Sequence, residues 1–340
     1  MNYIGSKLKL STWIKEEVEK TVSSDLSDKV FCDIFAGTGI VGRTFKPHVK
    51  KIISNDIEHY SFVLNKNYIS NSTCMQDAQD YLDELNATPE CLDGFIYKNY
   101  CLGSGSGRQY FSDANGKKID AVRQKIKELK EREKIDDDMY YFLLTSLLES
   151  ADKVANTASV YGTFLKHLKK PAQKELLIKA ADFDERLSCD LNQHEIHKED
   201  SNTLIKKIKG DILYLDPPYN QRQYGANYHI LNTIALYDDF IPKGKTGVRK
   251  YSHSSYCKKR HVIQTFEDLI KNAEFNYIFL SYNNEGLMSK DEIQNIMSKY
   301  GKYDLRTKEH QKFKAYKTAP KEPKANSTFE YLHILQKDKF

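Results

Sequence analysis

The stretch Ile212-Leu213-Tyr214-Leu215-Asp216-Pro217-Pro218-Tyr219 decides which fold this 340-residue chain is expected to adopt. Its apolar first half is rich in β-forming residues and predicts a buried strand, which the two prolines end because neither can donate a hydrogen bond to a sheet. Asp216 therefore stands at the carboxyl end of a strand, where open α/β sheets bind ligands. A carboxylate, an unpaired carbonyl and the ring of Tyr219 suit a planar group that bears an amino group. The alternative is an ordinary strand end closed by a Pro-Pro turn.

A second predicted strand, residues 30–35, runs into the glycine-rich stretch Gly37-Thr38-Gly39-Ile40-Val41-Gly42. A helix and a strand at 51–55 follow, and that strand ends at Asp56. Strand, glycine turn, helix, strand and acid make up one mononucleotide-binding unit. The glycines match the GxGxxG pattern, and both a nicotinamide dinucleotide and S-adenosylmethionine can use such a turn. In either case Asp56 would accept hydrogen bonds from ribose hydroxyls, so the glycines alone do not distinguish the two cofactors.

A third acid, Asp200, ends the predicted strand 195–200 just before the Asp216 motif. This is the position of an acid that binds an adenine amino group. Asp56, Asp200 and Asp216 would thus line one edge of a single sheet. Three carboxylates there suit an adenosine and a second amino-bearing ring, whereas hydride transfer needs no carboxylate beside its donor. The arrangement favours S-adenosylmethionine over a nicotinamide cofactor.

Composition narrows the class of protein. Hydrophobic residues at 40% and aromatic residues at 12% exclude a disordered chain. We expect no membrane span, because no long uncharged apolar run exists, and no signal peptide, because the N-terminus lacks an apolar core. The six cysteines form no CxxC pairs, so we expect no disulfides, no metal site and a reducing cytoplasm. The net charge of +5 permits a polyanionic partner without demonstrating one.

The alternation of strands and helices stops between residues 73 and 194. A charged helix is predicted there at 119–134 and a long helix with an apolar face at 140–153, so this segment is expected to be a mostly helical insert. The α/β domain would then consist of residues 1–72 and 195–340. A basic segment at 302–324 is predicted to be a loop. The strands expected from the residues lie at 30–35, 51–55, 195–200, 212–215, 277–282 and 329–335.

Taken in order, these motifs resemble those of the alpha-group adenine-specific DNA methyltransferases, the family of Dam methylase and of many restriction–modification methylases. The resemblance covers essentially the whole chain. Tyr3-Ile4-Gly5-Ser6-Lys7 is similar to the N-terminal motif of that group, and Phe35-Ala36-Gly37-Thr38-Gly39 is similar to its glycine motif. Asn55-Asp56 resembles the ribose-binding acid, and Asp200 and Asp216-Pro217-Pro218-Tyr219 follow in the family's order.

The resemblance implies a Rossmann-like, S-adenosylmethionine-dependent methyltransferase sheet of seven mostly parallel strands, with an antiparallel last hairpin. It implies that the insert 73–194 recognises the target in DNA. One departure is Tyr3, which stands where a tryptophan is common. The residues implied to bind the cofactor are Tyr3, Lys7, Phe35, Gly37, Gly39, Asp56, Asp200 and Asp216. Those implied to receive a flipped adenine are Asp216, Pro217, Pro218 and Tyr219.

Two loops are candidates for contact with DNA. Arg108 follows the flexible loop 103–107 and is expected to bind a phosphate rather than read a base, since a glycine-rich flank gives reach but poor angular precision. The segment 220–229 carries amides, an arginine and tyrosines that suit closure over a base, although an ordinary surface loop is the simpler interpretation. The predicted DNA-binding residues are Arg108, Lys166, Arg222, Tyr224, Tyr228 and His229.

The sequence therefore predicts a site-specific adenine DNA methyltransferase, the modification enzyme of a restriction–modification system whose endonuclease acts separately. It would transfer a methyl group from S-adenosylmethionine to N6 of an adenine flipped out of duplex DNA. The alternatives are a methyltransferase for cytosine N4 or an RNA base, a non-catalytic specificity subunit, and a nicotinamide oxidoreductase. Asp216 favours adenine, because cytosine-specific relatives more often have serine there.

Overall fold

The computed structural model describes residues 5–71, 77–182, 194–311 and 327–338. They form two compact units. The α/β unit contains residues 6–57 and the described parts of 192–223 and 253–340. The helical unit contains the described parts of 58–191 together with 224–252. The helical unit is larger than the predicted insert 73–194, because the segments before and after that insert also pack within it.

The α/β unit is built on a seven-stranded sheet in the order β3-β2-β1-β4-β5-β7-β6. Strands β1 to β5 are parallel, and β7 runs antiparallel to both of its neighbours. The expected fold is confirmed. The strands are β1 Val30–Asp33, β2 Lys51–Asn55, β3 Glu195–His197, β4 Lys209–Leu215, β5 Glu274–Asn283, β6 Gly301–Gln311 and β7 Ser327–Lys337.

The prediction of a loop at 302–324 is wrong for its first part, which forms β6. This strand lies at the edge of the sheet and pairs only with β7. Charged residues on an edge strand discourage pairing with another chain. In β6 they also interrupt the alternation of apolar and polar residues from which a strand is predicted. Residues 312–326 lie outside the described part of the chain.

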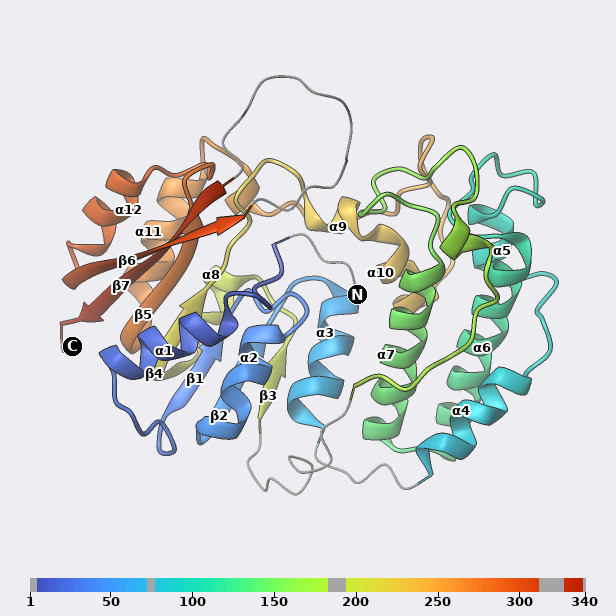
Figure 1. Cartoon of the computed structure of the whole chain (residues 1–340), viewed down its shortest axis with the longest axis horizontal. Coiled ribbons are helices and arrows are strands. Elements are labelled where there is room, and N and C mark those ends of the chain that lie inside the picture. Colours follow the sequence, from blue (N-terminus) through green and yellow to red (C-terminus); the bar gives the residue numbers. More distant parts are fainter. Residues whose placement is uncertain (1–4, 72–76, 183–193, 312–326, 339–340) are drawn as a thin grey trace. The chain divides into compact units, whose positions relative to one another are not determined.

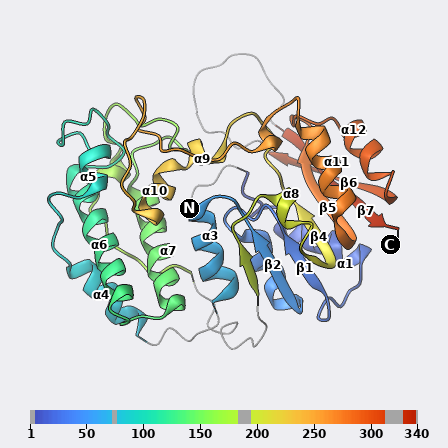
Figure 2. The same cartoon turned by 180° about the vertical axis from the view of Figure 1, so that it is seen from behind.

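Helices cover both faces of this sheet (Figures 1 and 2). Helices α1 and α2 lie on one face, and α8, α11 and α12 lie on the other. Burial on both faces explains why β4 reads as a continuous apolar run. The helices are α1 Ser11–Thr21, α2 Ile40–Phe45, α8 Ser201–Leu204, α11 Val262–Asn272 and α12 Lys290–Met297, with short 3-10 turns at Lys46–His48 and Ser255–Cys257.

Alternate residues of each strand point to opposite faces and build two apolar layers. On one face, Leu213 and Leu215 belong to the buried cluster that includes Phe266 of α11. On the other face, the ring of Phe31 in β1 stacks on that of Phe45 in α2, with centroids 4.1 Å apart. The central strands are therefore fixed from both sides, and so are the side chains at their carboxyl ends.

The strand order reverses between β1 and β4. From β1 the chain continues outward to β2 and β3, whereas β4 is followed by β5 on the other side. Open α/β sheets bind ligands beyond the carboxyl ends of the strands at such a point. The turn after β1 carries Gly37 and Gly39, and β4 ends directly before Asp216.

The helical unit contains both helices predicted for the insert. They are α6 and α7, and each begins at a capping side chain: Ser112 accepts a hydrogen bond from Asn115 N, and Asp136 accepts one from Met139 N. No helix in the described part of the chain is long and apolar enough to cross a membrane. The elements are α3 His59–Asn65, η2 Lys66–Ser70, α4 Ala78–Ala87, α5 Phe95–Tyr100, α6 Asp113–Glu131, α7 Asp137–Val154, η3 Lys170–Gln173, α9 Tyr224–Asn227 and α10 His229–Leu236.

Candidate active site

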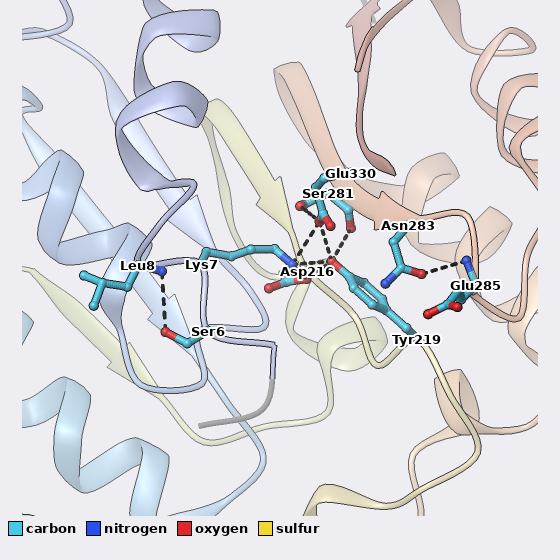
Figure 3. A network of polar contacts seen from close by, with 9 residues as sticks. All are labelled: Ser6, Lys7, Leu8, Asp216, Tyr219, Ser281, Asn283, Glu285 and Glu330. Atoms are coloured by element: carbon cyan, nitrogen blue, oxygen red, sulfur yellow. Dashed lines mark hydrogen bonds and ion pairs between the residues drawn. The ribbon is translucent and has the colours of Figure 1, made fainter. Parts of the chain in front are cut away.

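A buried polar network surrounds Asp216 at the end of β4 (Figure 3). The Lys7 ammonium lies 3.1 Å from Asp216 Oδ1 and 3.0 Å from Glu330 Oε1, and it also donates to the Tyr219 hydroxyl. That hydroxyl is 2.6 Å from Asp216 Oδ1 and 3.0 Å from Glu330 Oε1. Its single hydrogen can donate to only one of the two carboxylates at a time. Three of the predicted site residues thus meet at one point.

Glu330 is the network residue that sequence reasoning missed. It lies on β7 opposite Asn283 and is almost completely buried. Its Oε1 atom accepts a hydrogen bond of 2.7 Å from the Ser281 hydroxyl. The sequence did contain a sign of this role, because an acid inside the apolar strand predicted at 329–335 requires a buried partner. Its partners come from distant parts of the chain, so spacing could not identify them.

Charges inside this network set its protonation. Burial alone would lower the pKa of Lys7, but the charges of Asp216 and Glu330 outweigh it and raise that pKa above its ordinary value. Burial raises the pKa of Asp216, although Lys7 and the Tyr219 hydroxyl act in the opposite direction. Within the network, the single ammonium of Lys7 faces the carboxyl groups of both Asp216 and Glu330.

Two acceptors remain open at the end of β4. Both contacts of Asp216 with Lys7 and Tyr219 use Oδ1, and no described residue is hydrogen-bonded to Oδ2. No donor in the described part of the chain reaches the Pro217 carbonyl either. Pro218 fixes the backbone between this carbonyl and Tyr219. An amino group placed here would find two oxygen acceptors within one dipeptide.

The ring of Tyr219 is held on several sides. Its hydroxyl lies in the network, and the Lys7 ammonium is 4.6 Å from the ring centroid. The Tyr282 ring packs edge-on at a centroid distance of 4.8 Å. The Leu287 amide donates to the Tyr219 carbonyl over 3.1 Å. The position of this ring relative to Asp216 is therefore set by the protein before any ligand binds.

The glycine turn after β1 has the backbone that its glycines predict. Gly37 and Gly39 have φ angles of 52° and 75°, in the left-handed region where a side chain is strained. The Gly37 amide donates to Asp56 Oδ2 over 2.8 Å, so this turn and the acid after β2 lie together as expected. Of the predicted cofactor residues, Tyr3 lies outside the described part of the chain.

Asn55, the residue before Asp56, ties three strand ends together. Its side-chain amide donates to the Ile34 carbonyl over 3.0 Å and to the Glu199 carbonyl over 3.1 Å. Its Oδ1 accepts from the Glu199 amide over 2.9 Å. Asn55 is 2% exposed, so these bonds are shielded from water. Sequence reasoning treated Asn55 only as a neighbour of the acid.

Asp200 caps α8 and borders a cavity of about 340 Å³. Its Oδ1 accepts from the Thr203 amide over 3.0 Å, while the carboxylate remains exposed. Phe35, from the glycine motif, packs edge-on against Tyr256 with centroids 4.9 Å apart. Tyr256 therefore joins two predicted cofactor residues at one place. The cavity is lined by Asp200, Asn202, Ser255, Tyr256, Gln264, Thr265 and Asp268.

Asp33 is a second buried acid that sequence reasoning did not assign to the site. Burial, with the nearby charges of Asp216 and Asp56, holds the pKa of Asp33 well above its ordinary value. The shift shows that a negative charge on Asp33 is costly beside the acids at the ends of β2 and β4.

The predicted DNA contacts divide into exposed and buried residues. Lys166 and Arg222 are exposed, and Tyr224 is half-buried. Tyr228 and His229 have no exposed surface, and burial lowers the pKa of His229 to about 4. The His229 Nε2 atom instead lies 3.0 Å from the Tyr161 carbonyl. A DNA-contacting role for Tyr228 and His229 has no support from these positions.

Arg108 lies where its guanidinium is engaged within the helical unit. It donates to the carbonyls of Asn99 at 3.1 Å, Gly244 at 3.0 Å and Lys245 at 3.3 Å. Three of its five N–H donors are thus bound to backbone. This geometry supports a structural role for Arg108 rather than the predicted phosphate contact.

The chain is similar to known proteins over nearly its whole length. The family described as D12 class N6 adenine-specific DNA methyltransferase matches residues 3–296. The chain is 61% identical to the Type II methyltransferase M.NlaIII of Neisseria lactamica, over 99% of both chains. It is 39% identical to the Type II methyltransferase M.CviAII of Paramecium bursaria Chlorella virus 1, over 98% of both. It is 37% identical to the Type II methyltransferase M.FokI of Planomicrobium okeanokoites, over 99% of this chain and 53% of that protein.

Proposed function

Because the chain belongs to the family of D12 class N6 adenine-specific DNA methyltransferases, we propose that it transfers the methyl group of S-adenosylmethionine to N6 of an adenine flipped out of duplex DNA. The observation that carries this proposal is the state of Asp216: Oδ1 is held by Lys7 and Tyr219, while Oδ2 has no partner among the described residues. A carboxylate fixed in this way can accept a hydrogen bond from an incoming amino group without having to reorient.

The residues present fit the proposed methyl donor. The left-handed turn at Gly37 and Gly39 lets a ligand approach the backbone closely, and Asp56 beside it can accept from ribose hydroxyls. The cavity beside Asp200 and Tyr256 has the size and the acceptor for an adenine. The carboxyl groups of Asp216 and Glu330 outnumber the single ammonium of Lys7, which favours a cationic ligand. Bound S-adenosylmethionine supplies an electrophilic methyl group on a positively charged sulfur.

The chemistry assigned to the protein is orientation and charge placement. An adenine amino group is a poor nucleophile because its lone pair is delocalised into the ring. Asp216 Oδ2 and the Pro217 carbonyl would each accept one N–H, which favours a pyramidal nitrogen with its lone pair directed away from the two acceptors. Holding the reacting atoms in this way is a large source of rate enhancement. The Tyr219 ring would stack on the extruded base and offset part of the few kcal/mol that extrusion costs, about the magnitude seen for flipped bases.

For the whole chain we propose the role of a modification enzyme. The relatives it resembles are named Type II methyltransferases. We therefore expect a restriction endonuclease that recognises the same DNA and acts separately from this enzyme. Its place of action would be the prokaryotic cytoplasm, on DNA. We assign recognition of the DNA target sequence to the helical unit, including the predicted insert 73–194, because the proposed sites for the cofactor and the flipped base lie in the α/β unit.

The test is methyl transfer with a radiolabelled donor to duplex DNA, followed by digestion and identification of the modified nucleoside. We expect N6-methyldeoxyadenosine from the wild-type protein and none from Asp216→Asn. N4-methyldeoxycytidine would assign the enzyme to the other amino base. Methylation of RNA in place of DNA would overturn the substrate. Tight DNA binding without any methylated product would indicate a specificity subunit.

A further inference from the structure

Residues 241–250 of the helical unit form a small hairpin, here called the lysine hairpin. The amides and carbonyls of Lys243 and Val248 are paired, with N–O distances of 3.1 and 2.9 Å. Between them, Gly244 and Gly247 have φ angles of 64° and 68°, which allow the tight turn. Figure 1 shows this loop in gold and orange beside α5.

One end of the lysine hairpin is clamped by Arg108. Its guanidinium donates to the carbonyls of Gly244 and Lys245 in the turn, and to that of Asn99 near the end of α5. A side chain at Gly247 would place Cβ 2.6 Å from Arg108 Nε, so glycine is required for this approach. The Tyr100 hydroxyl adds a bond of 2.8 Å to the Gly247 carbonyl.

A second clamp holds the base of the hairpin. Arg249 makes two bonds of 2.9 Å to the Asp238 carboxylate and lies 4.9 Å from the Phe240 ring centroid. Bidentate arginine–carboxylate pairs combine strength with fixed geometry. The two arginines therefore set the backbone of the lysine hairpin from both ends.

The lysine side chains of this hairpin take no part in these two clamps. Lys243, Lys245 and Lys250 are exposed, and none is paired with a carboxylate in the described part of the chain. Ile241, which precedes them, is 86% exposed. Exposed lysines are common, but these three stand on a backbone that the contacts of Arg108 and Arg249 hold in place. A surface that is ordered before binding loses little conformational entropy when a partner docks.

We propose that the lysine hairpin binds the sugar-phosphate backbone of the DNA substrate, with Lys243, Lys245 and Lys250 as the phosphate contacts. Arg108 acts as a positioning residue that holds the hairpin and does not itself touch DNA. Contacts of this kind fix where a protein sits on the duplex and carry no sequence information. The inference rests on the proposed function, since it identifies a surface for that enzyme's substrate.

The experiment is duplex binding over a salt series with the variant Lys243→Ala/Lys245→Ala/Lys250→Ala. The slope of log K against log salt is negative, and each lost phosphate contact should make it less negative by about 0.9. For three contacts, raising salt fourfold should weaken wild-type binding about 40-fold more than it weakens variant binding, from a slope difference of about 2.7. The variant that replaces all three lysines by arginine keeps the charge and should retain the wild-type slope.

The charge-matched control removes three lysines at the C-terminal end of α6 and just beyond it, Lys127, Lys130 and Lys134. Lys127 and Lys134 are exposed and Lys130 is half-buried, and the triple replacement gives the same change in net charge. Lys127 and Lys130 lie roughly 17–26 Å further along the helix than its first turn, at about 1.5 Å per residue. The control should keep the wild-type salt slope.

The outcomes separate this inference from the proposed function. A hairpin variant with an unchanged slope, or a control that loses as much slope as the hairpin variant, overturns the inference even if the wild-type enzyme methylates adenine. A loss of slope confined to the hairpin variant supports it, whatever base is methylated. Cofactor affinity and the melting temperature should stay at wild-type values in the hairpin variant, which excludes misfolding as the cause.

Discussion

Replacing Lys7 by methionine should destabilise the protein more than any exposed ion pair could. The ammonium is the only cation within the described Asp216–Tyr219–Glu330 network, and it is 4% exposed. Methionine fills a similar volume but leaves two carboxylates close together without a counter-charge. Breaking a buried pair from one side costs about 3–5 kcal/mol, because the remaining charge stays desolvated. We expect a loss of that size in the free energy of unfolding near neutral pH.

The loss should depend on pH in a defined direction. Burial already raises the pKa of Asp216 in the folded protein, and removing the Lys7 charge, which acts in the opposite direction, should raise it further above the unfolded value of about 4. A group whose pKa is raised by folding contributes stability below its unfolded pKa and loses it as pH rises through the folded pKa. The variant's deficit in the free energy of unfolding should therefore be small at about pH 4, close to the unfolded pKa of a carboxyl group, and should grow as the pH rises.

Urea unfolding at several pH values measures both effects. Lys15→Met is the matched control, since Lys15 pairs with Glu19 one turn further along α1 at 2.5 Å and both side chains are only half-buried. Such an i,i+4 pair contributes about 0.3–0.5 kcal/mol. Adding Glu330→Gln to Lys7→Met should recover part of the loss, because it removes one of the two facing charges. If Lys7→Met cost no more than Lys15→Met, or if its deficit shrank as pH rose, the charge balance described for this site would be wrong.

Three further changes test individual residues. Asp216→Ala should abolish methyl transfer while the fold persists, because Glu330 still neutralises Lys7; turnover near the wild-type rate in a folded variant would refute the catalytic assignment. Asp56→Ala should weaken S-adenosylmethionine binding by about 1.5–3 kcal/mol, roughly 10- to 150-fold, as for hydrogen bonds to charged groups, and calorimetry showing unchanged affinity would contradict this. Asn55→Ala leaves buried backbone groups without partners and should lower the free energy of unfolding by about 1–3 kcal/mol or more; a change below about 0.5 kcal/mol in urea unfolding, the ordinary surface range, would show that water replaces the amide.

Much of the fold followed from local pattern. The strand before Asp216 and the glycine turn at Gly37 were predicted because their signals, an apolar run ended by prolines and glycines in left-handed backbone, depend on neighbouring residues. β6 was missed because its charged side chains obscure the period of two. An edge strand has no neighbouring strand on its open side, so it can carry charged residues and resemble a loop in sequence.

The site was predicted less completely than the fold. Lys7, Asp216 and Tyr219 were identified by motif, but Glu330 joins them from β7, more than a hundred residues after Tyr219. Arg108 shows the opposite error: a basic residue after a flexible loop suggested a surface contact, and tertiary structure turned its guanidinium toward backbone carbonyls. A cation's partners depend on what the fold brings near it, which spacing along the chain does not record.

The position of β7 has a consequence for biosynthesis. This strand is the last described element of the chain, yet it inserts between β5 and β6, which are made before it. Until it is translated, β5 presents an open edge to other chains, and the network around Asp216 lacks Glu330. A nascent or prematurely terminated polypeptide that lacks β7 would therefore be prone to pair with other chains along β5, and its Lys7 would lack the Glu330 carboxylate.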